Sequence, residues 1–204
     1  DTCLRSLANW QRVKHCDLLL CKDFTDFGLL SLTKNMQLHH LHLTQCGQLT
    51  DMSLQCLAHQ TALECLSLRL VDKITDTGLR SLQSLSTLCR LDVSGCRRIT
   101  PAALREVLPQ FARLTSLSAN GSQVNDEVMT SLHGLDNLSS IELADARVTG
   151  ASIIDISRAA FAPKLSAIDL SRCRIGDDAL RSLTHLPSLT FLSLAGTRIS
   201  DGGI

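Results

Sequence analysis

Several residue types and patterns are scarce in this 204-residue chain. It has no Tyr, one Trp and five Phe, so a protein interface here would lack most of the aromatic anchors that dominate many binding energies. Its 20 Lys and Arg balance 20 Asp and Glu, and no basic run is long enough to follow a phosphate backbone or an anionic membrane surface. The composition therefore argues against nucleic acid and membrane partners.

Long apolar runs and familiar catalytic motifs are also missing. Apolar stretches such as residues 17–21 fall far short of the roughly 20 residues that span a bilayer, and the first residues lack the pattern of a signal peptide. We find no Gly-x-Ser-x-Gly elbow, no phosphate-binding glycine loop and no His-Glu-x-x-His pair. The sequence thus predicts a protein that is not an enzyme and that needs no cofactor or metal.

One motif recurs along the whole chain. An apolar residue occupies the first, fourth and sixth positions of each unit, as in Leu63, Leu66 and Leu68. Eight units begin at Val13, Leu38, Leu63, Leu88, Leu114, Leu138, Leu165 and Leu189, which by subtraction lie 25, 25, 25, 26, 24, 27 and 24 residues apart. A period of this length is typical of a solenoid. We interpret residues 1–204 as a single domain of about eight repeats.

Each unit has the pattern of a short strand followed by a helix. The apolar fourth and sixth positions have the period of two that is typical of a strand. An apolar residue such as Ile74 follows a turn, and after it come a Thr or Ser that can cap a helix and often an Asp that suits its positive end. The expected caps are Thr25, Thr50, Thr75, Thr100 and Ser200. Helix leucine pairs, such as Leu79 with Leu82 and Leu180 with Leu183, would cover the back of the sheet.

These units predict an α/β fold, a right-handed solenoid shaped like a horseshoe. Its parallel sheet would form the concave side and its helices the convex side. Each repeat would bury its apolar face only against its neighbours, so the core is expected to run as one continuous ribbon.

Cysteine fills the ninth position of four units, at Cys21, Cys46, Cys96 and Cys173. Segments of the type Ile74-Thr-Asp-Thr-Gly-Leu79 accompany it. In these features nearly the whole chain resembles the cysteine-containing leucine-rich repeats of F-box/leucine-rich-repeat proteins. The resemblance implies substrate recognition for a ubiquitin ligase on the concave face. A structural scaffold repeat within a larger multiprotein assembly is the alternative interpretation, because similar repeats serve unrelated roles.

Both ends of the sequence fall inside a repeat. Residues 1–7 match residues 76–82 at six of seven positions, and residues 201–204 begin another helix pattern. Within the 204 residues we find no F-box-like helical segment ahead of the repeats. Because solenoid ends usually carry polar caps, we expect the sequence to be truncated at both ends and to belong to a longer polypeptide.

The nine cysteines predict structural thiols rather than disulfides. Their number is odd, they occur about once per repeat, and several lie in core positions, where thiols act as small apolar residues. Thiols kept reduced indicate a cytoplasmic or nuclear protein. The glycosylation sequons at Asn120 and Asn137 would be silent there.

Two columns of strand residues should face the solvent on the concave sheet. The third positions are His15, His40, Cys65, Arg90, Ser116, Ser140, Ala167 and Phe191, and the fifth positions are Asp17, His42, Ser67, Asp92, Ser118, Glu142, Asp169 and Ser193. Neighbours within a column would lie about 4.8 Å apart at the backbone. His15, Asp17, His40, His42 and Cys65 are therefore expected to form one patch.

Three interpretations of this patch are open. A zinc site is one, because imidazole, thiolate and carboxylate are zinc ligands, although no familiar ligand spacing supports it. A nucleophilic pair of Cys65 and His40 is another, but an open sheet offers no oxyanion pocket. A polar surface for protein contacts is the interpretation that we favour.

The second half of the concave face combines carboxylates with small residues such as Ser94 and Gly95. This combination predicts binding of a basic or extended peptide, although solubilising carboxylates would give the same pattern. The predicted partner-binding residues are His15, Asp17, His40, His42, Arg69, Arg90, Asp92, Glu142, Asp145 and Asp169. The oligomeric state is not predicted.

Overall fold

A computed structural model describes residues 12–34 and 37–203, and the repeat pattern at residues 1–7 lies outside these ranges. Eight three-residue strands form one sheet: β1 (His15–Asp17), β2 (His40–His42), β3 (Cys65–Ser67), β4 (Arg90–Asp92), β5 (Ser116–Ser118), β6 (Ser140–Glu142), β7 (Ala167–Asp169) and β8 (Phe191–Ser193). The strands are parallel and follow chain order from β1 to β8. The predicted parallel sheet with one strand per repeat is confirmed.

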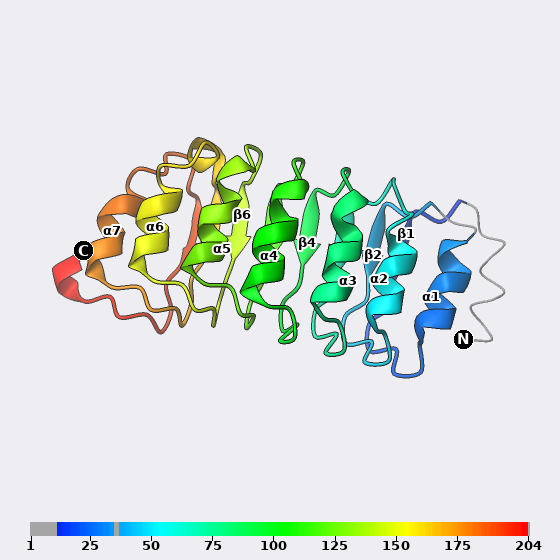
Figure 1. Cartoon of the computed structure of the whole chain (residues 1–204). Helices are drawn as coiled ribbons and strands as arrows, with labels where there is room; N and C mark the ends of the chain where they lie inside the picture. Colours follow the sequence, from blue (N-terminus) through cyan, green and yellow to red (C-terminus); the bar gives the residue numbers. More distant parts are fainter. Residues whose placement is uncertain (1–11, 35–36, 204) are drawn as a thin grey trace.

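One helix follows each of the first seven strands: α1 (Asp26–Thr33), α2 (Asp51–Leu57), α3 (Asp76–Ser81), α4 (Pro101–Val107), α5 (Asp126–Ser131), α6 (Gly150–Ile156) and α7 (Asp177–Leu183). Short 3-10 helices occur at η2 (Leu82–Ser84), η3 (Leu108–Gln110), η4 (Leu132–Gly134), η5 (Ala162–Lys164) and η6 (Asp201–Gly203). The α-helices form a single layer on one face of the sheet (Figure 1). We call the other face, predicted to be concave, the open face. Within the described ranges no helix is long and apolar enough to cross a bilayer.

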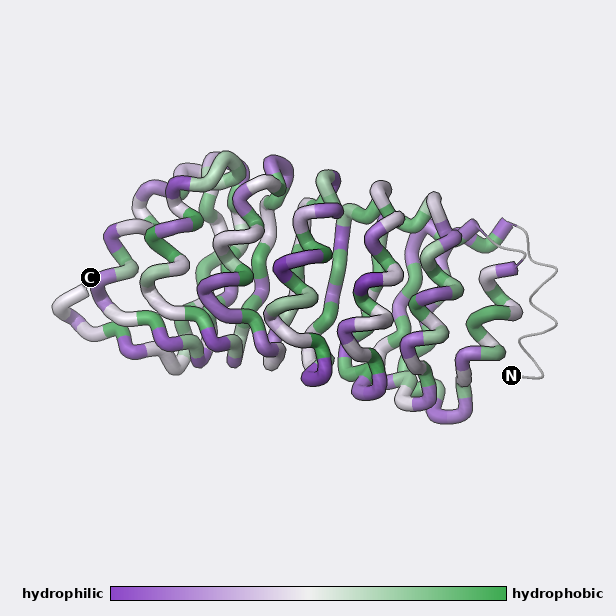
Figure 2. The backbone as a smooth tube through the Cα atoms, viewed as in Figure 1, coloured by the Kyte–Doolittle hydropathy of each residue, from purple (hydrophilic) through white to green (hydrophobic). Residues whose placement is uncertain are grey.

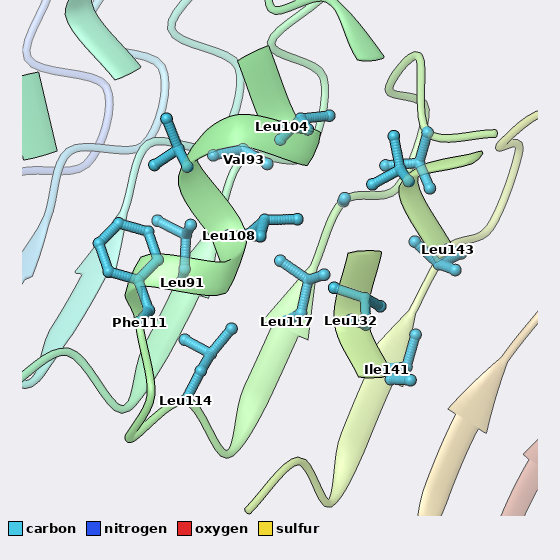
Figure 3. Close-up of a cluster of buried hydrophobic side chains, with 14 of the residues drawn as sticks. Leu91, Val93, Leu104, Leu108, Phe111, Leu114, Leu117, Leu132, Ile141 and Leu143 are labelled. Atoms are coloured by element: carbon cyan, nitrogen blue, oxygen red, sulfur yellow. The ribbon is translucent and has the colours of Figure 1, made fainter. Parts of the chain in front are cut away.

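The core lies between the sheet and the helix layer. The fourth-position residues from Leu41 to Ile168 are buried, whereas Cys16 in the first repeat is partly buried and Leu192 in the last is exposed. Leu91 and Leu117 point toward helix residues such as Leu104 and Leu108 (Figure 3). Hydrophobic and hydrophilic residues alternate along the tube (Figure 2). This alternation fits the expectation that each repeat buries its apolar face against its neighbours.

The helix leucine pairs behave as predicted in the middle of the chain and differ near its end. Leu79 and Leu82 are fully buried, although Leu82 belongs to η2 rather than to α3. Leu183 is buried, whereas Leu180 is only partly buried. Leu180 lies in α7, and only β8 and η6 follow that helix among the described residues.

Helix caps connect one repeat with the next. Thr50, Thr75 and Thr100 accept hydrogen bonds from helix amides, as predicted. Each also donates its hydroxyl to the Asp that begins the preceding helix, for example Thr75 Oγ1 to Asp51 Oδ2 at 2.6 Å, while Thr75 N donates to Asp51 Oδ1 at 2.8 Å. The Asp therefore caps its neighbour's helix entrance, an interaction beyond the predicted effect on its own helix.

Candidate functional site

The open face carries the two predicted columns. The strand register pairs His15 with His40, His40 with Cys65 and Cys65 with Arg90 at the third position. It likewise pairs each fifth-position residue with the next, as in Glu142 with Asp169. This register follows from the constant spacing of the strand motif, because a shift by one residue would turn the apolar fourth position toward the open face.

The patch at β1–β3 contains two separate arrangements. His15 and His40 stack with ring centroids 4.2 Å apart. His42 lies between Asp17 and Cys65, with its Nδ1 4.0 Å from Asp17 Oδ2 and its Nε2 3.6 Å from Cys65 Sγ. The imidazole beside Cys65 is thus that of His42, not of His40 as in the nucleophilic pair considered above. His42 shares the face of Cys65 because their strands are adjacent and in register.

The zinc interpretation gains no support from this geometry. Among residues 12–34 and 37–203, no group of three or more His, Cys, Asp or Glu side chains is arranged to hold a metal ion. Burial lowers the pKa of His40, and the neighbouring His15 lowers it further. The stacked pair therefore resists becoming doubly cationic.

Three carboxylates line the second half of the open face and accept hydrogen bonds from neutral groups. Asp92 accepts from Ser67 Oγ at 3.1 Å and from Ser94 N, in the turn after β4, at 2.8 Å. Glu142 accepts from Ser118 Oγ at 3.1 Å. Asp169 accepts from the amide and the hydroxyl of Ser171. None of the three carboxylates forms an ion pair within the described part of the chain.

Asp145 differs from these three carboxylates. Arg172 Nε donates to its Oδ1 at 2.7 Å, and a second guanidinium nitrogen contacts Oδ2. The hydrogen bond from Arg172 lowers the pKa of Asp145. Both residues occupy the eighth position of adjacent repeats, so an alignment of that column could have found the pair. Because Arg172 already balances its charge, Asp145 would attract a cationic partner less strongly than an unpaired carboxylate.

The basic members of the predicted site lie closer to its histidine half. Arg90 is on β4 in register with Cys65, and Arg69 follows β3. Both side chains are exposed. Neither forms an ion pair with a described residue. The open face therefore changes from histidine and arginine near β1–β4 to carboxylate near β4–β7.

Three of the four ninth-position cysteines, Cys46, Cys96 and Cys173, are buried core residues, whereas Cys21 is half-buried. Cys46 Sγ donates to Leu18 O at 2.9 Å, and Cys96 Sγ donates to Leu68 O at 3.0 Å. Cys173 makes the same bond to Leu143 O. Burial raises the pKa of Cys96 to about 12 and that of Cys173 to about 11. These thiols are protonated at neutral pH and serve as hydrogen-bond donors between repeats. All eight described cysteines are free.

Comparisons with known proteins agree with this architecture. The profile of the family described as "Leucine Rich repeat" matches residues 162–183 and 185–204. No curated protein sequence matches the chain. Internalin C2 from Listeria monocytogenes is similar in structure, with a TM-score of 0.69 and 21% identity over 97% of this chain and 76% of that one. A second internalin from that organism has a TM-score of 0.59 and 18% identity over 97% and 65% of the two chains.

The chain is therefore an α/β leucine-rich-repeat solenoid. At these identities the likeness to the internalins shows the fold alone. Folds of this class generally mediate protein–protein interactions by presenting an extended sheet surface to a partner. In this chain the open face is the exposed surface of that sheet.

Proposed function

We propose that the chain is a protein-interaction module that binds a basic, extended segment of a partner on its open face. The observation that carries the proposal is the set of three carboxylates, Asp92, Glu142 and Asp169, which lack cationic partners among the described residues. Their charges are held in place by serine and backbone donors rather than neutralised. A Lys or Arg of a partner would supply the missing opposite charge.

The spacing of these carboxylates suits an extended peptide. Strands lie about 4.8 Å apart, so Glu142 and Asp169 on β6 and β7 stand one strand apart, while Asp92 on β4 stands two strands from Glu142. A segment that crosses the strands advances about 3.3 Å per residue. Basic residues about one to two positions apart would therefore reach Glu142 and Asp169, and residues about three positions apart would reach Asp92 and Glu142. Ala144 and Ala195 beside these carboxylates add little side-chain bulk to this face.

We further propose that this binding serves substrate recognition for an F-box-type ubiquitin ligase in the cytoplasm or nucleus. Support comes from the resemblance of the cysteine slots to F-box/leucine-rich-repeat proteins. A scaffold role in a larger assembly is the competing proposal. The full-length sequence separates them, since an upstream F-box-like segment favours the ligase and coiled-coil segments favour the scaffold. Glycan on Asn137 in the native protein would contradict the proposed location in the cytoplasm or nucleus.

The binding proposal can be tested with a fluorescent peptide of alternating Lys and Gly and a Glu-for-Lys counterpart. The triple variant Asp92→Lys, Glu142→Lys and Asp169→Lys should weaken binding of the Lys peptide at least tenfold, because like charges then face each other. A matched triple, Glu127→Lys, Asp136→Lys and Asp178→Lys, changes the net charge equally at exposed sites off this column. Equal affinity of both triple variants, or no preference for the Lys peptide, would reject the proposal.

A further inference from the structure

One thiol on the open face has surroundings that no core thiol shares. Cys65, on β3, is half-buried, and its Sγ lies 3.6 Å from His42 Nε2. The core thiols of Cys46 and Cys96 instead donate to backbone carbonyls. Cys89, also half-buried, donates to Thr87 O at 3.3 Å. Cys65 is thus the open-face thiol that has an imidazole at its side.

Asp17, His42 and Cys65 form a line across three consecutive strands. His42 Nδ1 faces Asp17 Oδ2 at 4.0 Å, while its other ring nitrogen faces the thiol. A proton on Nδ1 is favoured by the carboxylate, and Nε2 then has its lone pair directed at Cys65. Contacts of this kind are often loose before a reactant is bound. The paired strands β1, β2 and β3 hold all three residues on one sheet.

The thiol needs a base to react at neutral pH. Burial raises the pKa of Cys65, with Arg90 acting in the opposite direction and Asp92 and Cys89 adding to the rise. Few thiolates would therefore form unaided, and only the thiolate is a strong nucleophile. His42 Nε2 is the nearest acceptor for the proton.

We propose that Cys65 is a site of reversible thiol–disulfide exchange with a small, carboxylate-bearing disulfide, in which His42 accepts the thiol proton and Asp17 orients the imidazole. Cys65 Sγ bonds to one sulfur of the disulfide, and the original S–S bond breaks. The departing thiolate takes the proton from His42. The products are one mixed disulfide and one free thiol, so atoms and electrons balance. This site acts on a small molecule and is independent of the proposed peptide binding.

Disulfide exchange suits this open surface better than acyl transfer does. Acyl transfer builds charge on a carbonyl oxygen and requires aligned donors for it. Exchange at sulfur proceeds through attack on a disulfide and has no such oxyanion. A base, a nucleophile and access from solvent are therefore sufficient.

Arg90 and a neighbouring hollow indicate the class of disulfide. Arg90 is in register with Cys65 on the next strand and exposed, so its charge favours a reactant with carboxylates. Asp92, further along β4, opposes this attraction but accepts hydrogen bonds from Ser67 and Ser94. On the other side of His42 lies a hollow of about 230 Å³, lined by His15, Cys16, Asp17, His40 and His42. It offers space for part of a small reactant.

The rate of modification of each cysteine provides the test. We suggest reacting the native chain with a small excess of 5,5′-dithiobis(2-nitrobenzoate), a disulfide with two carboxylates, and locating the adducts by peptide mass spectrometry. Cys65 should react faster than Cys89. His42→Gln should slow Cys65 about tenfold at neutral pH, less than the usual general-base contribution of about 10²–10⁴, and leave Cys89 within twofold. Asp17→Asn, which keeps the thiol–imidazole contact, should slow Cys65 by a smaller factor.

Two further readouts distinguish a base from a merely structural residue. The difference between native and His42→Gln should shrink as the pH rises, because the thiol then ionises without help. Arg90→Gln should slow the dicarboxylate reagent more than uncharged 4,4′-dithiodipyridine, because only the first loses the attraction of Arg90, while both lose its lowering of the Cys65 pKa. An unchanged Cys65 rate in His42→Gln, a difference that stays constant with pH, or a native Cys65 no faster than Cys89 would overturn the proposal.

Discussion

At the scale of the residue, the eighth position of every repeat has a left-handed backbone. Three glycines and five other residues adopt positive φ there: Leu20, Gln45, Leu70, Gly95, Gly121, Asp145, Arg172 and Gly196. A side chain in this conformation costs about 1–2 kcal/mol. The turn after each strand therefore imposes a conformation that glycine alone adopts freely.

Gly95→Ala should destabilise the chain by about 1–3 kcal/mol. Its φ is +73°, and the added Cβ would overlap Leu70 Cδ2. The added Cβ of Gly121→Ala would meet no atom within 4 Å, but Gly121 has a φ of +61°. This substitution should therefore cost only the strain of a left-handed backbone. Gly47→Ala, with neither problem, should have little effect. Urea denaturation of the three variants measures this order, and equal stabilities would contradict it.

Leu91→Ala should lower the free energy of unfolding by about 2–5 kcal/mol, because it leaves a cavity between sheet and helices. Leu91 is 2% exposed. Leu192, the same position in the last repeat, is 40% exposed, so Leu192→Ala should cost less. A loss below about 0.5 kcal/mol for Leu91→Ala in urea melts would mean that this residue is not in the core.

Some features at this scale could be predicted from the sequence and others could not. The order of residues in the two open-face columns was predicted from the period of two and the constant repeat spacing. The strand register of the structure confirms it. The partner of Cys65 did not follow, because sequence spacing places both His40 and His42 within reach and only side-chain directions decide. Asp145 and Arg172 share one repeat column in the sequence, but the left-handed turn that aligns them was not apparent, because five non-glycine residues occupy that position.

At the scale of the element, carboxylates at the start of one helix hold the entrance of the next. Asp26, Asp51, Asp76, Asp126 and Asp177 accept hydrogen bonds from Thr50, Thr75, Thr100, Thr149 and Ser200 in that order. Where Pro101 or Gly150 begins the helix, the next cap is Asn125 or Gly176. Helices that begin with Asp are thus followed by a Thr or Ser cap, whereas those that begin with Pro or Gly are followed by another residue type. The sequence displayed this pattern, but its meaning required knowledge of which helices are adjacent.

Asp51→Ala should cost about 1.5–3 kcal/mol, the usual range for hydrogen bonds to a charged group. It would leave both Thr75 N and Thr75 Oγ1 without their carboxylate. Thr75→Ala and the double variant complete a thermodynamic cycle, in which the two losses should not add. Additive losses would mean that the two residues do not interact. Glu106→Ala, which removes an exposed ion pair with Arg80, is a control expected to have little effect.

Helix length was predicted less well than strand position. Leu82, Leu108 and Leu132 are buried in 3-10 helices that follow short α-helices. The leucine spacing fits either kind of helix, since both bring residues three apart to neighbouring positions. The strand motif has no such ambiguity.

At the scale of the whole molecule, stability should fall in acid. Burial opposes ionisation of Asp26 and Asp126, but hydrogen bonds from Ser53 and Thr50, and from Ser152 and Thr149, outweigh it and lower each pKa. A carboxyl group with a lower pKa in the folded state stabilises the fold above its unfolded pKa of about 3.9. That contribution is lost as the pH falls through the folded pKa.

The midpoint of urea denaturation should therefore be lower at pH 3 than at pH 6. Asp126→Asn should reduce this difference, because an amide does not titrate. Asp136→Asn, at an exposed site, provides the control. A midpoint that is independent of pH, or equally dependent in all three proteins, would contradict a role for the helix-entrance carboxylates.

The central claim is that the open face of the molecule binds a partner. The most direct measurement is a ¹⁵N–¹H NMR titration of the chain with a Lys-rich extended peptide. Binding on the open face should perturb amides at Asp92–Ser94, Ser118–Asn120, Glu142–Ala144 and Asp169–Ser171, and leave the exposed side of α4–α7 unchanged. Perturbations confined to the helices, or none at peptide concentrations near 1 mM where weak complexes of about −4 kcal/mol are detectable, would contradict the account.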